Sequence, residues 1–514
     1  NYLVNAKPIF ITYQDTAVSV EPFEIHINDG ILDGVLMFGV ISEGRLKMAN
    51  FDARVITQFI NSKYLDLSGI VFGELSFQNL DNNLSYDVDI ALKKGNYLGK
   101  EYDQMNLSFL LNSSKIIIDD FSFTADTSLG FELSGILPFK KLNKPNAEVS
   151  LNTTFKDLPL GMVHRLIPDF FNLGGDATGS LNIGGNLGKT NFNYVASIDN
   201  AVFDKIYLGS LRSKGNYNGS FLSVEYAESR DNLDRIVSKG DVPFDLNLNS
   251  DNFGQFFEDK NINYNASAKL ASMSFLSTYI TELDSISGSI NIDLLLSGPS
   301  SAIIRNGEIS LSNSSIYTML TNNPIIAVNG KGVLKNNKLN IENLMGSSID
   351  IRDNNFEKIK DNISVKGSID FSKFFEPHYD LTVNSIDNKY IYLDAIPIDI
   401  TGIIDSMDVK VFGKDTVNIA GLIEVDEATL FHEFISEDIG ETLISSDGVI
   451  MSYSLNIPIK DEGKFQNSQV DAIMTGEISL AKTGNEYWNI GGEVYIDDGS
   501  ILSFKDNFTG LNGY

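Results

Sequence analysis

The sequence predicts a mainly β protein: a long, continuous, twisted antiparallel β-sheet curled into a taco- or groove-like solenoid, with a few short amphipathic helices. Three observations carry this prediction. Apolar and polar residues alternate with a period of two, turn-forming pairs separate the alternating runs, and related segments recur roughly every 110 residues.

The alternation is clearest in three short runs. Phe23–Ile27, Ser289–Leu294 and Glu493–Ile496 each place apolar side chains at every second position, as in strands with one apolar and one polar face. Asp-Gly, Asn-Gly, Asn-Asn and Ser-Ser pairs lie between such runs and favour turns. Because helical periodicity is not sustained, we expect well over half of the chain to be sheet.

Composition excludes several classes of function. The chain has 514 residues, with 39 basic and 68 acidic side chains and a formal net charge of −29 at pH 7. A field of this sign repels nucleic-acid phosphates, and no basic stripe compensates for it, so nucleic-acid binding is not expected. Cysteine is absent, which excludes disulfides and thiolate metal sites and fits an oxidising compartment.

The sequence contains no secretory signal, transit peptide or apolar run long enough to span a membrane. It starts at Asn1 inside a strand-like run, Tyr2–Thr12, and stops at Tyr514 after a glycine-containing turn. We therefore interpret the sequence as a fragment cut at both ends. A missing anchor then says little about the longer protein.

The first recurring segment is a strand that we expect to end in a tight turn. Two apolar residues stand two positions apart, two polar residues and a small one follow, and apolar residues resume almost at once. Asp, Asn and Gly allow the positive φ that a tight turn needs. The copies are Glu24–Gly30, Val195–Ala201, Glu308–Ser314, Leu422–Ala428 and Glu493–Gly499.

The second recurring segment is a short helix-like patch followed by a glycine-led strand. Each patch places four apolar residues on one face of about two helical turns. The strands begin at Gly73, Gly179 and Gly288, spaced by roughly 110 residues. The patches are Val55, Ile56, Phe59 and Ile60; Met162, Val163, Leu166 and Ile167; and Phe275, Leu276, Tyr279 and Ile280.

The third recurring segment is a strand pair. Gly215–Val224 aligns with Gly332–Ile341, and Leu107–Phe121 resembles an earlier copy. A repeat of this kind fits either a row of separate β-sandwich domains or one continuous sheet. We favour the continuous sheet, because the strand pattern crosses the unit boundaries without a polar or Gly/Pro-rich linker. The twist of so long a sheet would curl it into a trough.

Taken together, the strand-turn motif, the glycine-led strands and the short helices resemble the TamB family, the translocation and assembly module proteins of diderm bacteria, which are related to the AsmA-like proteins. The similarity is greatest over Ile398–Phe508. There, Val417–Gly421 leads into Leu422–Val425 as Trp488–Gly492 leads into Glu493–Ile496. The resemblance implies a repetitive β-groove region over residues 1–390 and part of a TamB-like C-terminal domain over 391–514.

The resemblance also implies a location and partners. Members of this family are anchored in the inner membrane by an N-terminal helix and span the periplasm as a β-taco with an apolar groove. They work with an outer-membrane assembly barrel of the TamA or BamA type, in phospholipid movement and outer-membrane protein assembly. The anchor is missing from this sequence, so any membrane attachment would lie outside it.

A groove of this kind would bind phospholipid acyl chains, because each buried methylene contributes about 0.8 kcal/mol. No cofactor is implied. The candidate groove-lining residues are the alternating apolar ones of the recurring strands, although alternation alone does not distinguish them from a closed core. They are Ile25, Ile27, Leu75, Phe77, Leu181, Ile183, Ile290, Ile292, Ile309, Leu311, Ile423, Val425, Val494 and Ile496.

An enzyme is not expected. The four histidines are scattered without metal-ligand spacing, and Gly188-Lys189-Thr190 lacks the first glycine of a phosphate-binding loop. The acidic pairs Asp119-Asp120, Asp426-Glu427 and Asp497-Asp498 lack the spaced ligands of a calcium loop, and we interpret them as turn residues. The alternative function is an extracellular adhesin of tandem β-sandwich domains, which separate closed sandwiches in the structure would favour.

Overall fold

We describe the fold from a computed structural model of the whole chain. The described residues are 3–511 without the segments 6–7, 55–66, 81–82, 98–99, 126–128, 140–145, 162–172, 204–205, 274–282, 319–320, 351–360, 374–375, 387–388, 396–399, 432–449, 485, 487–488 and 505–506. Two compact units divide the chain. Unit 1 comprises 1–231, 237–264 and 298–301, and unit 2 comprises 232–236, 265–297 and 302–514.

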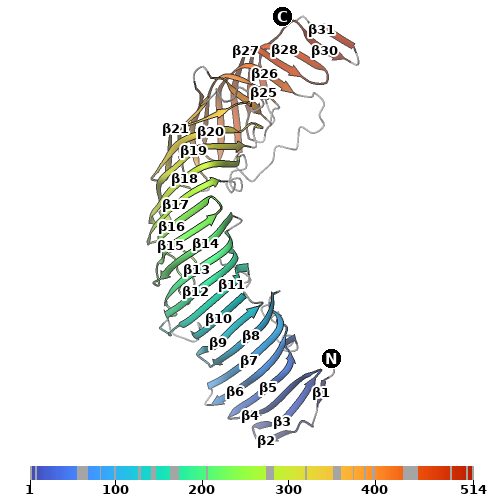
Figure 1. Cartoon of the computed structure of the whole chain (residues 1–514), viewed down its shortest axis with the longest axis vertical. Coiled ribbons are helices and arrows are strands. Elements are labelled where there is room, and N and C mark those ends of the chain that lie inside the picture. Colours follow the sequence, from blue (N-terminus) through green and yellow to red (C-terminus); the bar gives the residue numbers. More distant parts are fainter. Residues whose placement is uncertain are drawn as a thin grey trace. The chain divides into compact units, whose positions relative to one another are not determined.

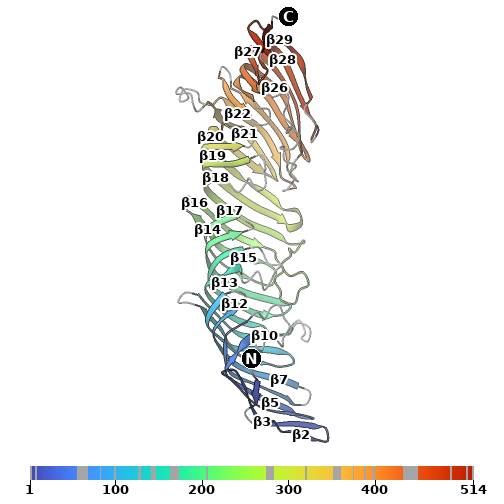
Figure 2. The same ribbon diagram turned by 90° about the vertical axis from the view of Figure 1, so that its right-hand side faces the viewer.

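Unit 1 contains β1–β15; β1 and β2 both pair with β3, and the strands from β3 onward follow one another in chain order (Figures 1 and 2). Their bounds are β1 Leu3–Asn5, β2 Ile11–Gln14, β3 Ala17–Ile27, β4 Gly30–Phe38, β5 Ser42–Asp52, β6 Ile70–Leu80, β7 Asn83–Tyr97, β8 Lys100–Leu111, β9 Lys115–Ala125, β10 Leu129–Pro138, β11 Ser150–Pro159, β12 Leu173–Asn186, β13 Lys189–Phe203, β14 Ile206–Tyr217 and β15 Leu222–Asp231.

Strands β16 Asp234–Val242 and β17 Asn261–Ser272 contain residues of both units. The remaining strands belong to unit 2, except that Gly298 and Pro299 at the end of β18 belong to unit 1. They are β18 Leu283–Pro299, β19 Ile304–Thr318, β20 Ile325–Lys335, β21 Lys338–Ser348, β22 Ile363–Asp370, β23 His378–Ser385, β24 Ile391–Ala395, β25 Ile400–Gly413, β26 Thr416–Phe431, β27 Ile450–Gln466, β28 Val470–Lys482, β29 Asn489–Ile496, β30 Ser500–Phe504 and β31 Asn507–Leu511.

The described strands form one long, open, mixed sheet, which confirms the mainly β prediction. The expectation of a wholly antiparallel sheet is wrong at one place, because β26 and β27 pair in parallel, with Thr416 opposite Ile450. A parallel pair needs a crossover of a dozen or more residues. The segment between Phe431 and Ile450 is long enough to supply it, and alternation within each strand carries no signal of strand direction.

The short amphipathic helices are not borne out. Among the described residues the helical element with defined bounds is the 3-10 turn Ser300–Ala302, and the pairs 53–54 and 160–161 are also helical. The three four-residue patches that led to this prediction lie in 55–66, 162–172 and 274–282, outside the described residues. The three glycines that follow the patches do lie in strands, β6, β12 and β18.

The first recurring segment forms a tight turn where we expected one in two copies. Ile27 pairs with Gly30, so Asn28 and Asp29 make a two-residue hairpin, and Asn28 has φ of 55°. At the other end of the chain, Asp497–Gly499 turns between β29 and β30.

In the other three copies the tight-turn prediction is wrong, because the strand continues. These copies lie inside β13, β19 and β26, where the pairing register shifts. Asn200 and Asn313 have φ of 52° and 47° at two of the shifts. A left-handed residue permits either a turn or a β-bulge, and the local sequence does not say which.

The acidic pairs likewise lie either at a turn or inside a strand. Asp497-Asp498 lies at a turn, as expected. Asp119-Asp120 lies inside β9 and Asp426-Glu427 inside β26, both beside register shifts, so their interpretation as turn residues is wrong. An unpaired bulge residue shares the preference of turns for polar side chains that tolerate local distortion.

The third recurring segment is confirmed as a strand pair with a conserved register. Gly215 of β14 lies opposite Val224 of β15, and Gly332 of β20 lies opposite Ile341 of β21. The earlier copy is the hairpin of β8 and β9, where Leu107 lies opposite Phe121. The same sequence pattern therefore places an equivalent pair on the same face three times.

At one end of the strands in unit 1, five side chains form a buried row across β5–β9. Phe51 lies opposite Val71, Leu92 opposite Val71 and Met105, and Phe123 opposite Met105. All five side chains are at most 4% exposed. A bulge between Met48 and Phe51 precedes this row and bends β5.

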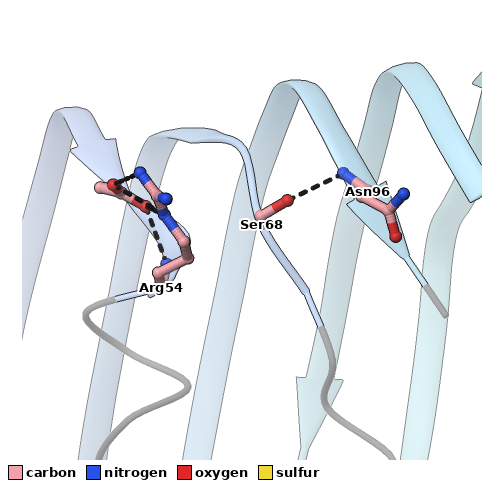
Figure 3. A network of polar contacts seen from close by, with 4 residues as sticks. Arg54, Ser68 and Asn96 are labelled. Atoms are coloured by element: carbon pink, nitrogen blue, oxygen red, sulfur yellow. Dashed lines mark hydrogen bonds and ion pairs between the residues drawn. The ribbon is translucent and has the colours of Figure 1, made fainter. Parts of the chain in front are cut away.

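Polar contacts stabilise the end of the sheet at which the buried row lies (Figure 3). The backbone N–H of Asn96 donates to the hydroxyl of Ser68 at 3.0 Å, and the guanidinium of Arg54 donates to the carboxylate of Asp52. The hydroxyl of Tyr102 donates to the carbonyl of Ser68 at 2.5 Å. Burial raises the pKa of Tyr102 to about 12.

In unit 2, two strands lie end to end along a third. β23 pairs with the second half of β25 and β24 with its first half. Buried Asn362 holds the junction, since its amide donates to the carbonyls of Ser348 at 2.8 Å and Tyr390 at 2.7 Å. A buried amide with satisfied hydrogen bonds is rigid, so Asn362 fixes the positions of β23 and β24 relative to each other.

Gly73→Ala should destabilise unit 1. Gly73 has φ of +139°, and a Cβ there would lie 2.1 Å from the carbonyl oxygen of Asp89 on the neighbouring strand. Because the clash is with backbone, we expect the free energy of unfolding to fall by about 2 kcal/mol or more in urea denaturation. Gly130→Ala is the matched control, since its nearest neighbour would be the Cβ of Lys156 at 3.9 Å. Equal free energies of unfolding for Gly73→Ala and Gly130→Ala would contradict the register that places Gly73 beside Asp89.

Tyr102→Phe should change the alkaline stability profile. The pKa of folded Tyr102 is raised to about 12, above the usual value of about 10. Its neutral form therefore stabilises the fold fully below pH 10, and this contribution is lost between pH 10 and 12. The variant should lose about 1 kcal/mol at neutral pH with the hydrogen bond to Ser68. Its stability should also fall less steeply above pH 10 than that of the parent, measured by denaturant titration; parallel profiles would argue against a buried hydroxyl.

Candidate functional site

The candidate site is the face of the sheet on which the apolar side chains of successive strands meet. In unit 1 the pairing registers place one residue from each of β3–β15 in a continuous row, each opposite the next. We name this the first row. It consists of Ile25, Leu32, Met48, Gly73, Ile90, Leu107, Phe121, Leu133, Thr153, Leu181, Tyr194, Gly215 and Val224.

A second row runs beside the first on the same face, two residues along each strand except in β9, where a register shift makes the spacing three. It too passes from β3 to β15 by direct cross-strand pairing, and every member is apolar or glycine. The second row consists of Phe23, Gly34, Leu46, Leu75, Val88, Phe109, Ile118, Gly135, Leu151, Ile183, Phe192, Tyr217 and Leu222. At about 4.8 Å between strands, each row extends for roughly 60 Å along the sheet.

Most side chains of the two rows are half-buried rather than buried. The contrast is clear in β7, where first-row Ile90 is partly accessible while Leu92 of the buried row is 2% exposed on the same strand and face. In unit 1 the strand pairs in substantial contact are neighbours in the sheet. Within the described residues, therefore, no second layer of sheet or helix seals the two rows.

The total accessible surface agrees with incomplete burial. It is 30406 Å² for a chain of 56.7 kDa. Two compact units of half this mass would together expose roughly 22,000 Å². The chain thus exposes more surface than two compact units of this mass would.

Aromatic rings lie over glycines on this face. A Cβ at Gly34 would lie 2.4 Å from the ring of Phe23, and one at Gly44 would lie 2.3 Å from the ring of Phe77. Each ring therefore covers the backbone of a neighbouring strand, as in the aromatic rescue of strand glycines. Phe77 also stacks with Phe38, with ring centroids 5.9 Å apart. These contacts keep the apolar surface continuous where a side chain is missing.

Unit 2 has a corresponding apolar row. It passes from β18 to β29 by direct pairing and includes a step across the parallel pair. The unit 2 row consists of Ile290, Leu311, Gly330, Leu344, Val365, Val383, Val409, Gly421, Leu455, Leu480 and Ile490.

The opposite face of unit 1 is polar and charged. Glu24 lies opposite Asp33, Asp33 opposite Lys47, Lys47 opposite Glu74, and Glu74 opposite Asp89. A hydrogen bond from Arg45 holds the pKa of Glu74 below its usual range. The sheet in this unit is therefore two-faced, with one surface suited to water and one suited to apolar ligands.

The structure places the predicted groove residues on the apolar faces. Ile25, Leu181, Leu75 and Ile183 belong to the first and second rows, while Ile290, Leu311 and the other predicted residues of β18, β19, β26 and β29 belong to the apolar face of unit 2. Their exposures differ. Ile290 and Val425 are 1% and 6% exposed, whereas Val494 and Ile496 are exposed at an edge strand.

Three of the predicted residues have more specific surroundings. Ile27 packs against the buried row, and Phe77 covers Gly44. Ile292 lies opposite Ile309, beside the unit 2 row. Ile423 lies opposite Met407 on the same face of unit 2.

Sequence reasoning missed most of the first and second rows. It selected residues only from copies of the first recurring segment and from the glycine-led strands, so β4, β7, β8 and β9 contributed no residue. Alternation in Tyr86–Leu92 and Leu107–Leu111 was a usable signal. The glycines Gly34 and Gly44 gave no signal, because their place on the apolar face depends on the register.

Among the residues that the structure describes, no group of His, Asp and Glu could hold a metal ion. No helix in the same part of the chain is long and apolar enough to cross a membrane. His26 lies on the polar face, with its imidazole 2.5 Å from the carboxylate of Glu24.

No protein-family model matches the chain, and no curated protein is similar enough to count as a relative.

A pair of cysteine substitutions tests whether the face is open. The chain contains no cysteine, so Ile90→Cys and Leu92→Cys each give a single thiol on the same strand and face. We expect a small thiol reagent to label the half-buried position at least tenfold faster than the 2% exposed one under native conditions. Equally slow labelling of both thiols would mean that the first row is sealed.

Proposed function

We propose that this chain is a lipid-binding β-groove scaffold, which shields and conducts phospholipid between the inner and outer membranes of a diderm envelope. The observation that carries the proposal is the pair of mainly apolar, mostly half-buried rows that pass from strand to strand through β3–β15. A soluble enzyme or a closed sandwich does not require such a face, whereas a carrier of acyl chains does.

The physical basis is the transfer of acyl chains from water to an apolar surface. Each methylene that the rows shield contributes about 0.8 kcal/mol, so a long tail gains several kcal/mol from partial contact alone. Because the rows continue from strand to strand, a tail can move along them without returning to water. The polar headgroup stays at the open side in solvent. No covalent step and no cofactor are needed.

The cellular setting rests on the TamB-like resemblance of the sequence. By that resemblance the full-length protein is held at the inner membrane, lies in the periplasm, and cooperates with an outer-membrane assembly barrel of the TamA or BamA type. Assistance in outer-membrane protein translocation and assembly is a second client activity that the same resemblance supports. An apolar trough could shield nascent strands as well as lipid tails.

The alternative, an adhesin of tandem β-sandwiches, predicts separate sheets packed face to face about 10 Å apart. The described strands instead form one sheet, and the apolar residues of unit 1 remain half-buried. These observations favour the scaffold over the adhesin.

Lipid capture tests the proposal directly. Native purification followed by mass spectrometry should recover phospholipid with the protein. A photoreactive residue at Ile292, on the apolar face, should crosslink to that lipid, since its neighbours Ile309 and Ile290 are apolar. The matched control is Asp293 on the polar face, which lies opposite Glu308.

We expect at least tenfold more lipid adduct at Ile292 than at Asp293. The exposed Val494 gives a second apolar position at the other end of unit 2. Absence of co-purified phospholipid, together with no adduct at Ile292 or Val494, would overturn the proposal.

A further inference from the structure

The connection Pro243–Lys260, which we name the strap, has no regular secondary structure but a defined fold of its own. The N–H of Asp245 donates to the carbonyl of Gln255 at 2.9 Å, and that of Phe257 donates to Pro243 at 2.9 Å. The rings of Phe244 and Phe256 stack with centroids 4.4 Å apart. Residues 246–253 form the tip of this small hairpin.

The tip lies on the apolar face of unit 1, at the end of β11–β14. The N–H of Leu246 donates to the hydroxyl of second-row Tyr217 at 2.9 Å, and the N–H of Asn249 donates to the carbonyl of Leu187 at 2.9 Å. Leu248 packs against the buried cluster that contains second-row Leu151. The strap thus reaches back to strands far from it in sequence.

Buried polar groups hold the tip in place. The side-chain oxygen of Asn247 accepts from the N–H of Thr190 at 2.9 Å, and its amide donates to the carbonyl of Gly219 at 3.1 Å. The hydroxyl of Thr190 accepts from the N–H of Leu248 at 3.1 Å. Asn247, Thr190 and Asp245 are all at least nine-tenths buried. A buried network satisfied in this way is rigid.

The strap changes the burial of the second row locally. Leu151 and Tyr217 are only 9% and 2% exposed, whereas Ile183 and Phe192, which lie between them in the row, are half-buried. The first-row neighbours Thr153, Leu181 and Tyr194 are also half-buried at these strands. Cover by the strap is therefore confined to part of the second row.

We infer that the strap is a fixed constriction of the lipid path. It occupies the apolar surface that an acyl chain would otherwise use at Leu151 and Tyr217, and it confines the chain to the first row across β11–β14. This inference rests on the proposed function. It adds that the face is not uniform, since the strap covers the second row at Leu151 and Tyr217 while the neighbouring first-row residues Thr153, Leu181 and Tyr194 stay half-buried.

The geometry favours a strap that stays in place over one that opens and closes. The tip makes hydrogen bonds to four separate points on the sheet ends, Leu187, Thr190, Tyr217 and Gly219, so opening it would expose several buried polar groups at once. Leaving each such group without a partner costs about 1–3 kcal/mol.

Single thiols in the cysteine-free chain provide the test. Leu181→Cys lies in the first row and Leu151→Cys under the strap. The probe is palmitoyl-oleoyl phosphatidylglycerol presented in mild detergent, and the readout is the rate of labelling by a maleimide with and without it. We expect the Leu181 thiol to label readily and to be protected at least fivefold by the lipid. The Leu151 thiol should label at least tenfold more slowly, with no change on adding lipid.

Release of the strap supplies the second arm. Asn247→Ala in the Leu151→Cys background should speed labelling and make it sensitive to the lipid, whereas Asn193→Ala, on the polar face of β13, should change nothing. A Leu151 thiol in the intact chain that labels and is protected like the Leu181 thiol would overturn the inference, even if the released variant fails to fold. Rapid labelling at Leu181 without lipid protection would instead contradict the proposed function, and the inference would fall with it.

Discussion

The cross-strand register is the constraint on which the rest of the structure depends. In a strand successive side chains point to opposite faces, so a slip of one residue anywhere between β3 and β15 would move an apolar set into water. Twelve consecutive pairings instead keep the two rows aligned. Short hairpins make this possible, because a two-residue turn such as Asn28-Asp29 fixes the register of both its strands.

Bulges and glycines then determine the local shape of the strands that the register aligns. The bulge between Met48 and Phe51 separates the half-buried first row from the buried row, and similar shifts occur in β11 and β13. Each bulge bends its strand and increases its local twist. Glycine has a complementary role, because Phe23 and Phe77 can lie flat across Gly34 and Gly44 and fill the space between neighbouring strands. Shape and apolar continuity therefore come from local backbone features.

The sequence predicts these features unequally. Alternation identifies the apolar positions of a strand such as Glu493–Ile496, and the hairpin of Gly215–Val224 follows from its turn residues. The choice between turn and bulge does not follow, since Asn28 closes a hairpin while Asn200 and Asn313 lie inside strands with nearly the same φ. Strand direction at β26–β27 and the position of the strap are set by long-range contacts, such as that of Asn247 with Thr190, which is 57 residues away in sequence. Local patterns carry no information about such contacts.

An open apolar face also has an energetic consequence for the fold. Domains ordinarily bury each apolar face against a second layer, whereas in unit 1 Met48 and Leu151 are the members of the two rows that belong to its described buried clusters. Half-buried side chains such as Ile90 and Leu107 forgo part of the roughly 25 cal/mol that each Å² of apolar burial contributes. A bound acyl chain would restore that contribution, and any ligand that binds only the folded state stabilises it by mass action. Under the proposed function the lipid would supply the second layer, and affinity for lipid and stability of the sheet would arise from the same contacts.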